Sequence, residues 1–174
     1  MKNRLELAQY FEKLGFTKGA EIGVSQGIYS KVLLDTIPNL QLLSVDAWTK
    51  WRISGALYEE TKKLLAPYPG STIVRKKSME AVKDIPQESL DFVFIDAEHR
   101  YPHVIEDVRE WSKKVRIGGI VSGHDYFHPR FPDVTKAVDE YVNEYGYKLE
   151  IVGADLMNPN IEEILPSWYF LKDK

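Results

Sequence analysis

The side chains with the clearest chemical meaning surround a glycine turn near the N-terminus. The chain reads Glu-Ile-Gly-Val-Ser-Gln-Gly over residues 21–27, and an acidic residue, Asp46, closes the next apolar run nineteen positions after Gly27. Glycine lets a backbone approach a ligand closely, and an acid at the end of the following strand can bind two ribose hydroxyls. The spacing therefore predicts a turn that binds a nucleoside.

The residue types in this turn argue against a dinucleotide. A dinucleotide fingerprint needs three glycines, and Ser25 and Ile28 stand where the second and third would lie. Glu21 lies just before the end of the strand, where its carboxylate would repel a phosphate and attract a cation. S-adenosyl-L-methionine is a nucleoside with a cationic sulfonium, and we expect a ligand of this kind.

Acidic and imidazole side chains follow two later apolar runs. Asp96 and His99 follow one run, and His124 and Asp125 follow the next. Adjacent parallel strands lie about 4.8 Å apart, so the two aspartates would fall within reach of one cation and would repel each other without it. Oxygen ligands suit magnesium or manganese, and an imidazole shifts the preference toward manganese, iron or a softer metal. We therefore predict a divalent-metal site formed by Asp96, His124 and Asp125.

Alternating strands and helices must carry these groups to one place. Apolar periodicity and glycine or proline stops predict helices at 4–14, 28–37, 54–65, 78–83, 102–115 and 134–145, and strands at 19–24, 40–45, 71–74, 89–96, 120–122, 148–152 and 167–171. We expect Gly118 and Gly119 to end the fifth of these helices. The pattern predicts a doubly wound α/β sheet, in which ligands bind outside the carboxyl ends of the strands.

With these residues the chain resembles the class I methyltransferases, which use S-adenosyl-L-methionine and whose first motif is an acid followed by Gly-x-x-x-Gly. Glu21, Gly23 and Gly27 occupy those positions. The resemblance covers nearly the whole chain. It implies a Rossmann-like, seven-stranded, mostly parallel sheet with helices on both faces. The last strand would run antiparallel between the fifth and sixth, with residues 153–166 as the connection.

The resemblance also implies how the cofactor is held. The backbone of residues 23–27 would cradle its amino-acid part, Asp46 would hold its ribose, and Ser78 would lie near the adenine edge or cap a helix. Trp48 would cover the adenosine, as part of a lid with residues 50–52. The full set of expected cofactor contacts is Glu21, Gly23, Ser25, Gly27, Ser30, Asp46, Trp48, Ser78 and Asp96.

The spacing Asp96-x-x-His99 narrows the resemblance to methyltransferase domain family 24. This branch comprises metal-dependent small-molecule O-methyltransferases related to macrolide-sugar O-methyltransferases and cephalosporin-hydroxylase-like proteins. It implies that Asp96 is a metal ligand and that His99 is the general base for a substrate hydroxyl, a role that contributes about 10²- to 10⁴-fold in rate. His124 stands where the branch has the first of two acids, so the metal and its affinity stay open.

These residues also have interpretations without catalysis. Asp96 would then only bond backbone amides, Asp125 would cap a turn, and His99 would be a solvated loop residue. The aromatic loop at 126–132 is expected to contact the acceptor, or else to be an ordered surface loop. A stacking surface for single-stranded nucleic acid around Trp48 is a further alternative.

Length and composition limit the remaining choices. At 174 residues with a net charge of −3, the chain fits one domain over residues 1–174, and nucleic acid is not its expected partner. The absence of cysteine excludes a disulfide framework, a thiolate nucleophile and a cysteine-ligated zinc site. Because no apolar run reaches about 18 residues, we expect a cytoplasmic protein without membrane association. A homo-oligomer stays open.

The sequence thus favours a methyltransferase that moves a methyl group from S-adenosyl-L-methionine to a hydroxyl of a small-molecule acceptor, with magnesium or manganese as a further cofactor. A non-catalytic cofactor-binding or scaffold protein is one alternative, and a metal-dependent hydroxylase or hydrolase is another. Nucleic-acid methylation is disfavoured, because Asp-Ala-Glu-His stands at 96–99 in place of an Asn/Asp-Pro-Pro-aromatic tetrapeptide.

Overall fold

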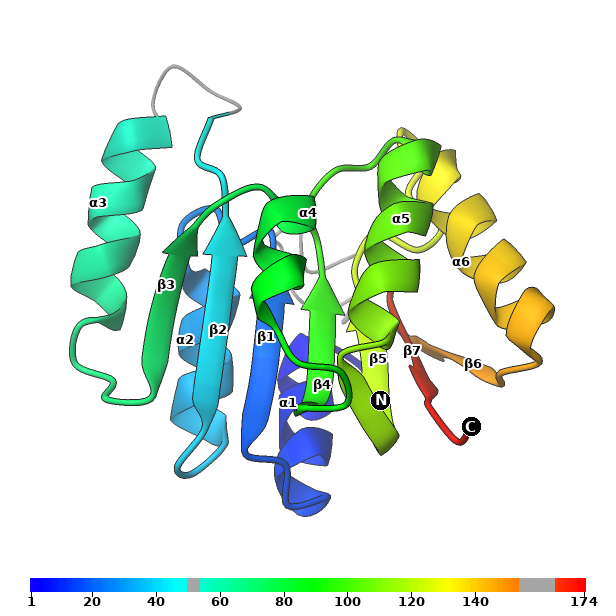
Figure 1. Ribbon diagram of the computed structural model, residues 1–174, viewed down its shortest axis with the longest axis horizontal. Helices are drawn as coiled ribbons and strands as arrows, with labels where there is room; N and C mark the ends of the chain where they lie inside the picture. Colours follow the sequence, from blue (N-terminus) through cyan, green and yellow to red (C-terminus); the bar gives the residue numbers. More distant parts are fainter. Residues whose placement is uncertain (50–53, 154–164) are drawn as a thin grey trace.

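The computed structural model of the protein describes residues 1–49, 54–153 and 165–174. Over these residues the chain forms one seven-stranded sheet in the order β3-β2-β1-β4-β5-β7-β6 (Figure 1). The strands are β1 (Lys18–Ile22), β2 (Gln41–Asp46), β3 (Ser71–Arg75), β4 (Leu90–Ile95), β5 (Val115–Gly123), β6 (Leu149–Val152) and β7 (Ser167–Leu171). Strands β1 to β5 pair in parallel, and β7 is antiparallel to β5 and β6. The expected doubly wound sheet is confirmed, with its last strand between the fifth and sixth.

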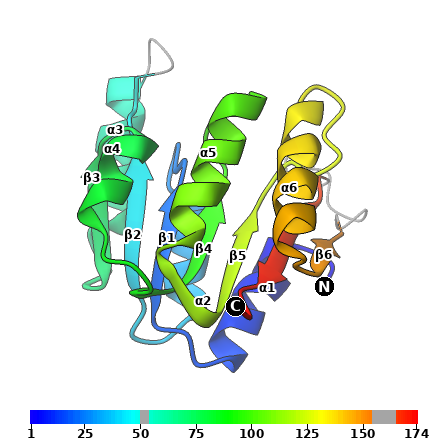
Figure 2. The ribbon, with the colours of Figure 1, turned by 45° about the vertical axis from the view of Figure 1, so that its right-hand side comes forward.

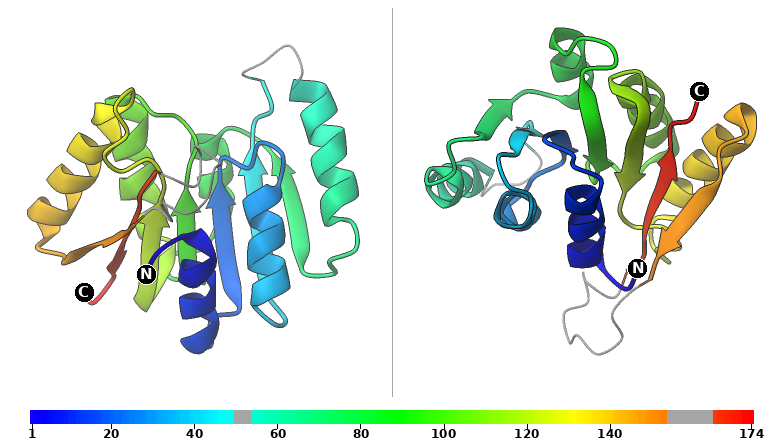
Figure 3. Two further views of the ribbon diagram at one scale, coloured as in Figure 1. Left: turned by 180° about the vertical axis from the view of Figure 1, so that it is seen from behind. Right: turned by 90° about the horizontal axis from the view of Figure 1, so that it is seen from below.

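Helices cover both faces of this sheet. They are α1 (Arg4–Lys13), α2 (Ile28–Thr36), α3 (Ser54–Leu65), α4 (Ser78–Ala81, continued by a 3₁₀ turn over Val82–Asp84), α5 (Tyr101–Ser112) and α6 (Pro132–Tyr145). Helices α4, α5 and α6 lie on the face turned toward the viewer in Figure 1, and Figure 2 shows α5 and α6 side by side. Seen from behind in Figure 3, α1 and α2 cover the opposite face, with α3 beside the β3 edge.

The core consists of two apolar layers, one on each face of the central strands. Val93 and Ile95 of β4 belong to the layer beneath α5 and α6, whereas Phe92 and Phe94 belong to the layer beneath α1 and α2. The ring of Phe92 stacks on that of Phe11 with their centroids 4.4 Å apart. A strand covered on both faces needs apolar side chains at consecutive positions, which explains the unbroken apolar run of β4.

The largest difference from the expected elements concerns β5. This strand begins at Val115, and α5 ends at Ser112, so Gly118 and Gly119 lie inside the strand and the expectation that they end a helix is wrong. Gly118 has φ +79°, and the pairing of β4 with β5 shifts register between Leu90 and Phe92. Glycine readily adopts a positive φ both at a strand irregularity and at a helix end. The glycine pair alone therefore does not distinguish the two, and the helix end was expected in place of the irregular strand.

The connection expected over 153–166 lies, apart from its ends, outside the described residues. Within the described ranges, no helix combines the length and hydropathy that crossing a membrane requires.

Candidate active site

The glycine turn follows β1 and leads into α2 at the carboxyl edge of the sheet. Its backbone takes positive φ values at Gly23 (+90°), Ser25 (+50°) and Gly27 (+77°). The Asp46 carboxylate lies beside the turn, and its Oδ2 accepts hydrogen bonds from the backbone N–H of Val24 at 3.0 Å and of Ser25 at 2.9 Å. The acid therefore holds the turn in shape, because carboxylate oxygens bind backbone amides strongly.

The hydrogen bonds that Asp46 already accepts limit how many ribose hydroxyls it can bind. Its Oδ1 accepts the N–H of Trp48 at 2.7 Å, so backbone amides use three of about four lone-pair positions on this carboxylate. Among the described residues this leaves one acceptor position open, which suits one ribose hydroxyl. The sequence predicted the acid but not its amide partners.

Trp48 fastens the same turn from its other side. The side chain is 4% exposed, its indole N–H donates to the Ser25 carbonyl at 2.9 Å, and its ring packs on Tyr58 with centroids 5.0 Å apart. The indole therefore lies between the turn and α3. The rest of the expected lid, Lys50, Trp51 and Arg52, lies outside the described residues.

Glu21 lies beneath the turn and is only 2% exposed. The Ser30 hydroxyl of α2 donates to its carboxyl group and lies 2.9 Å from the Ser44 hydroxyl of β2. Burial raises the pKa of Glu21 to about 8, against the smaller lowering effect of the Ser30 hydrogen bond. Without a cation nearby, the carboxyl group is therefore mostly protonated at neutral pH.

This pKa predicts a pH-dependent stability that Glu21→Gln should remove. The unfolded pKa of about 4.5 lies below the folded pKa of about 8, so the unfolded chain binds fewer protons between these values and the free energy of unfolding falls as pH rises. The slope reaches at most about 1.4 kcal/mol per pH unit. Urea unfolding at pH 5 and pH 8 should show Glu21→Gln gaining stability over the wild type with rising pH. Equal slopes in wild type and Glu21→Gln would contradict the raised pKa, and the exposed Glu12→Gln is the control.

Ser78 begins α4 and is bonded to the neighbouring helix. Its hydroxyl donates to the carboxyl group of Asp107 and accepts the indole N–H of Trp111 at 2.8 Å. Burial raises the pKa of Asp107 to about 6, with the Ser78 hydrogen bond acting in the opposite direction. Lys77 is the N-cap of α4, so the Ser78 side chain ties α4 to α5 rather than capping the helix.

The structure brings the predicted acid and imidazole groups together. One ligand atom each from Asp96, His124 and Asp125 lie within 4.8 Å of one another. His124 Nδ1 is 3.1 Å from Asp125 Oδ1 and 3.7 Å from Asp96 Oδ2. His99 Nε2 is 2.9 Å from Asp125 Oδ2 and 3.5 Å from Asp96 Oδ1. The order of the parallel strands explains the convergence, because Ile95 of β4 is in register with Gly123 of β5.

The two aspartates control the charge of His99. Burial by itself would lower the pKa of this imidazole, but Asp125 and Asp96 outweigh burial and raise the pKa to about 9. Burial would likewise raise the pKa of Asp125, whereas His124 and His99 hold it well below its usual range. The cluster is therefore an imidazolium–carboxylate group, in which His99 carries a proton unless another cation neutralises the aspartates.

The aromatic loop after Asp125 covers this cluster. Phe131 stacks on the His99 ring with centroids 4.2 Å apart and planes at 10°, and His128 packs on Phe131 at 4.2 Å. Phe127 has φ +62° and is 64% exposed. Phe131 of this loop thus lies against the ring of the candidate catalytic histidine.

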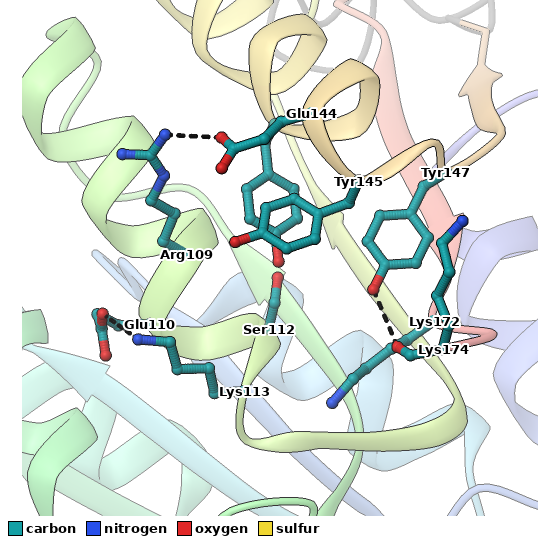
Figure 4. A pocket seen from close by; sticks show the side chains of 10 residues that line it. Arg109, Glu110, Ser112, Lys113, Glu144, Tyr145, Tyr147, Lys172 and Lys174 are labelled. Carbon is teal, nitrogen blue, oxygen red and sulfur yellow. Dashed lines mark hydrogen bonds and ion pairs between the residues drawn. The ribbon is translucent and has the colours of Figure 1, made fainter.

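A groove of about 670 Å³ between α5 and α6 lies elsewhere in the molecule (Figure 4). Its walls come from the last turns of both helices and from residues after β7, far from the carboxyl ends of the parallel strands. Its cations are bonded internally: Arg109 to Glu144 at 2.8 Å, Lys113 to Glu110 at 2.6 Å, and Lys172 to the Val115 carbonyl at 2.8 Å. The candidate chemistry is at the strand ends, where a cavity of about 10 Å³ beside Asp96 and His124 has room for about one water.

The fold and the turn with its acid define a class I methyltransferase. Residues 20–126 match the methyltransferase domain family, a span that includes the turn, Asp46 and the acid–imidazole cluster, and the chain belongs to that family. An uncharacterized protein of Acanthamoeba polyphaga mimivirus is 27% identical over 158 residues, which cover 84% of this chain and 71% of the viral protein.

Solved structures share the fold. An O-methyltransferase from Bacillus cereus in complex with SAH has a TM-score of 0.75 at 13% identity, covering 97% of this chain and 80% of that one. The O-methyltransferase TomG from Streptomyces achromogenes in complex with SAM has a TM-score of 0.72 at 15% identity, covering 98% and 80% of the two chains.

Proposed function

We propose that the protein is an O-methyltransferase that transfers the methyl group of S-adenosyl-L-methionine to a hydroxyl of a small-molecule acceptor. The observation that carries this proposal is the direct contact between the glycine turn and the backbone of Asp96, which belongs to the cluster of acidic and imidazole side chains. A Cβ atom built on Gly23 would lie 2.0 Å from the Asp96 carbonyl oxygen, so the two backbones touch. A methyl donor held by the turn would therefore lie beside the groups that orient and deprotonate an acceptor.

The proposed reaction needs alignment and one proton transfer. The acceptor oxygen attacks the methyl carbon, the carbon–sulfur bond breaks, and the sulfonium becomes the neutral thioether of S-adenosyl-L-homocysteine. When the aspartates are neutralised and His99 is itself neutral, the hydroxyl proton passes to its Nε2, the atom that faces the two aspartates. Phe131 keeps the ring plane of His99 fixed, which favours a productive geometry.

The residues of the cluster fit a divalent metal. Two carboxylates and an imidazole meet within 4.8 Å, and the 6%-exposed His124 turns its Nδ1 toward both carboxylates, 3.1 Å from Asp125 Oδ1 and 3.7 Å from Asp96 Oδ2. Asp96, Asp125 and His124 would hold the ion, which would neutralise the aspartates and lower the pKa of an acceptor hydroxyl. Neutralised aspartates would also stop holding a proton on His99, which leaves its Nε2 free to accept one.

The first test is calorimetric titration with S-adenosyl-L-methionine and S-adenosyl-L-homocysteine. We expect both to bind with dissociation constants in the micromolar range, with Glu21, Gly23, Ser25, Gly27, Ser30, Asp46, Trp48, Ser78 and Asp96 as the proposed contact set. A folded sample that gives no heat with either compound would refute the proposed function. Transfer of a radiolabelled methyl group to a panel of hydroxylated acceptors, with amine analogues as controls, tests oxygen as the acceptor atom.

Metal binding should stabilise the protein through Asp125. We expect manganese to raise the melting temperature more than magnesium does, because His124 supplies nitrogen, and a metal at about 100 times its dissociation constant adds about 2.7 kcal/mol. Asp125→Asn should abolish this shift while S-adenosyl-L-homocysteine still binds. A metal shift that survives Asp125→Asn would place the ion elsewhere. Metal binding without any affinity for the cofactor would favour the hydroxylase alternative.

A further inference from the structure

Ser25 adopts a backbone conformation that its neighbours must enforce. Its φ of +50° lies in the left-handed region, which a residue with a Cβ atom adopts at a cost of about 1 kcal/mol or more. The Ser25 N–H donates to Asp46 at 2.9 Å, and the Ser25 carbonyl accepts from the Trp48 indole at 2.9 Å. It also accepts from the Thr61 hydroxyl at 3.0 Å, whose single proton is shared with the Leu57 carbonyl at 2.8 Å. Both backbone polar groups of this strained residue are thus fixed by side chains from outside the turn.

Thr61 reaches the turn from α3, a helix beside the sheet edge (Figure 3). Its side chain is fully buried, although the adjacent residues Glu60 and Lys62 are exposed. Besides its bond to Ser25, its methyl group lies against Gly27, where a built Cβ atom would come within 2.9 Å of Thr61 Cγ2. The threonine therefore contacts the turn through both branches of its side chain.

We propose that Thr61 and Trp48 are positioning residues that jointly hold the Ser25 carbonyl and keep the glycine turn in its cofactor-binding form. The docking of α3 and the affinity for S-adenosyl-L-methionine are then coupled. This inference rests on the proposed function, because it assigns the turn to that cofactor. It extends the site to α3, which contributes by orienting the turn.

The shared acceptor atom predicts a specific pattern of effects. A carbonyl oxygen has two lone pairs, so losing one donor leaves the other in place, whereas losing both removes every donor that the described residues offer to this part-buried carbonyl. The turn can then relax from its strained conformation, and cofactor binding must restore it. The two losses should therefore be more than additive. By linkage, a bound cofactor should also protect α3 from local opening.

The experiment is a double-mutant cycle read by the dissociation constant of S-adenosyl-L-homocysteine. Thr61→Val keeps the size and the methyl contact but removes the hydroxyl, and Trp48→Phe keeps an aromatic ring but removes the N–H donor. We expect each single variant to weaken binding by up to about 3-fold and the double variant by more than about 10-fold, beyond the product of the singles. When Thr61→Ser, which keeps the hydroxyl, replaces Thr61→Val in the double variant, binding should return to the level of Trp48→Phe alone.

Ser112→Ala is the matched control, because the Ser112 hydroxyl is also buried on a helix and bonds the carbonyl four residues earlier, as Thr61 does with Leu57. It should leave the cofactor affinity unchanged. Additive losses, or a loss caused by Trp48→Phe alone and not deepened by Thr61→Val, would overturn the inference, since the two donors would then not act together through the Ser25 carbonyl.

Hydrogen exchange of the ligand-free protein separates this inference from the proposed function. Protection of α3 amides should fall in the double variant and not in Ser112→Ala. If the wild type bound no cofactor, the proposed function would fail. Independently of that result, unchanged α3 protection in the double variant would refute the connection between α3 and the turn.

Discussion

Asp46→Ala is expected to weaken binding of S-adenosyl-L-homocysteine by at least about two orders of magnitude. Three backbone N–H groups, from Val24, Ser25 and Trp48, lose their acceptor. The ribose hydroxyl also loses the acceptor position that Asp46 would offer it. Hydrogen bonds to a charged group contribute about 1.5–3 kcal/mol each, and 1.4 kcal/mol is tenfold in affinity. Calorimetry at constant pH measures the loss directly.

The matched control for this variant is Asp84→Ala. Asp84 is an exposed acid paired with Lys76 at 2.6 Å, so the variant removes the same charge without touching the turn, and its affinity should stay within about 2-fold of the wild type. Asp46→Asn should fall between, because one amide oxygen can serve the turn while the amide nitrogen opposes the Trp48 N–H. An Asp46→Ala variant that binds within 3-fold of the wild type would show that the acid does not organise the site.

The turn was predictable because its signals are local. Glycines at residues 23 and 27 and an acid at the end of the next strand depend only on spacing along the chain, and all three lie where the spacing predicts. The acid–imidazole cluster needed one further step, the adjacency of β4 and β5, which the alternation of strands and helices supplied. These predictions depended on backbone topology, which residue patterns specify well.

Side-chain partners depend on distances that spacing does not encode. Thr61 lies 36 residues after Ser25 and occupies the apolar face of α3. A threonine at that position is compatible with ordinary helix packing, so the sequence carries little indication that its hydroxyl would bond the turn. Trp111 and Val115 are four residues apart and read as one helical stripe, although Val115 begins β5. In the cluster, the ionic pairing of His99 with Asp125 depends on side-chain directions that the sequence leaves open.

Gly23→Ala is expected to destabilise the protein by about 2–5 kcal/mol and to abolish cofactor binding. The residue has φ +90°, and a Cβ atom would lie 2.0 Å from the Asp96 carbonyl oxygen and 2.6 Å from Ala97 Cα. The backbone strain contributes about 1–2 kcal/mol and the forced separation of two packed segments about 1–3 kcal/mol. For a chain of this size the melting temperature should fall by about 4–20 °C.

The contact at Gly23 also sets the distance between the turn and the Asp96 segment, so the variant should impair both ligand sites at once. Metal-induced and cofactor-induced shifts of the melting temperature should both be lost in any fraction that still folds. Gly55→Ala provides the control, because a Cβ atom at this α3 position meets nothing within 4 Å and alanine favours a helix by up to about 1 kcal/mol. If Gly23→Ala were as stable as Gly55→Ala and still bound S-adenosyl-L-homocysteine, the close backbone contact that joins the two halves of the candidate site would be refuted.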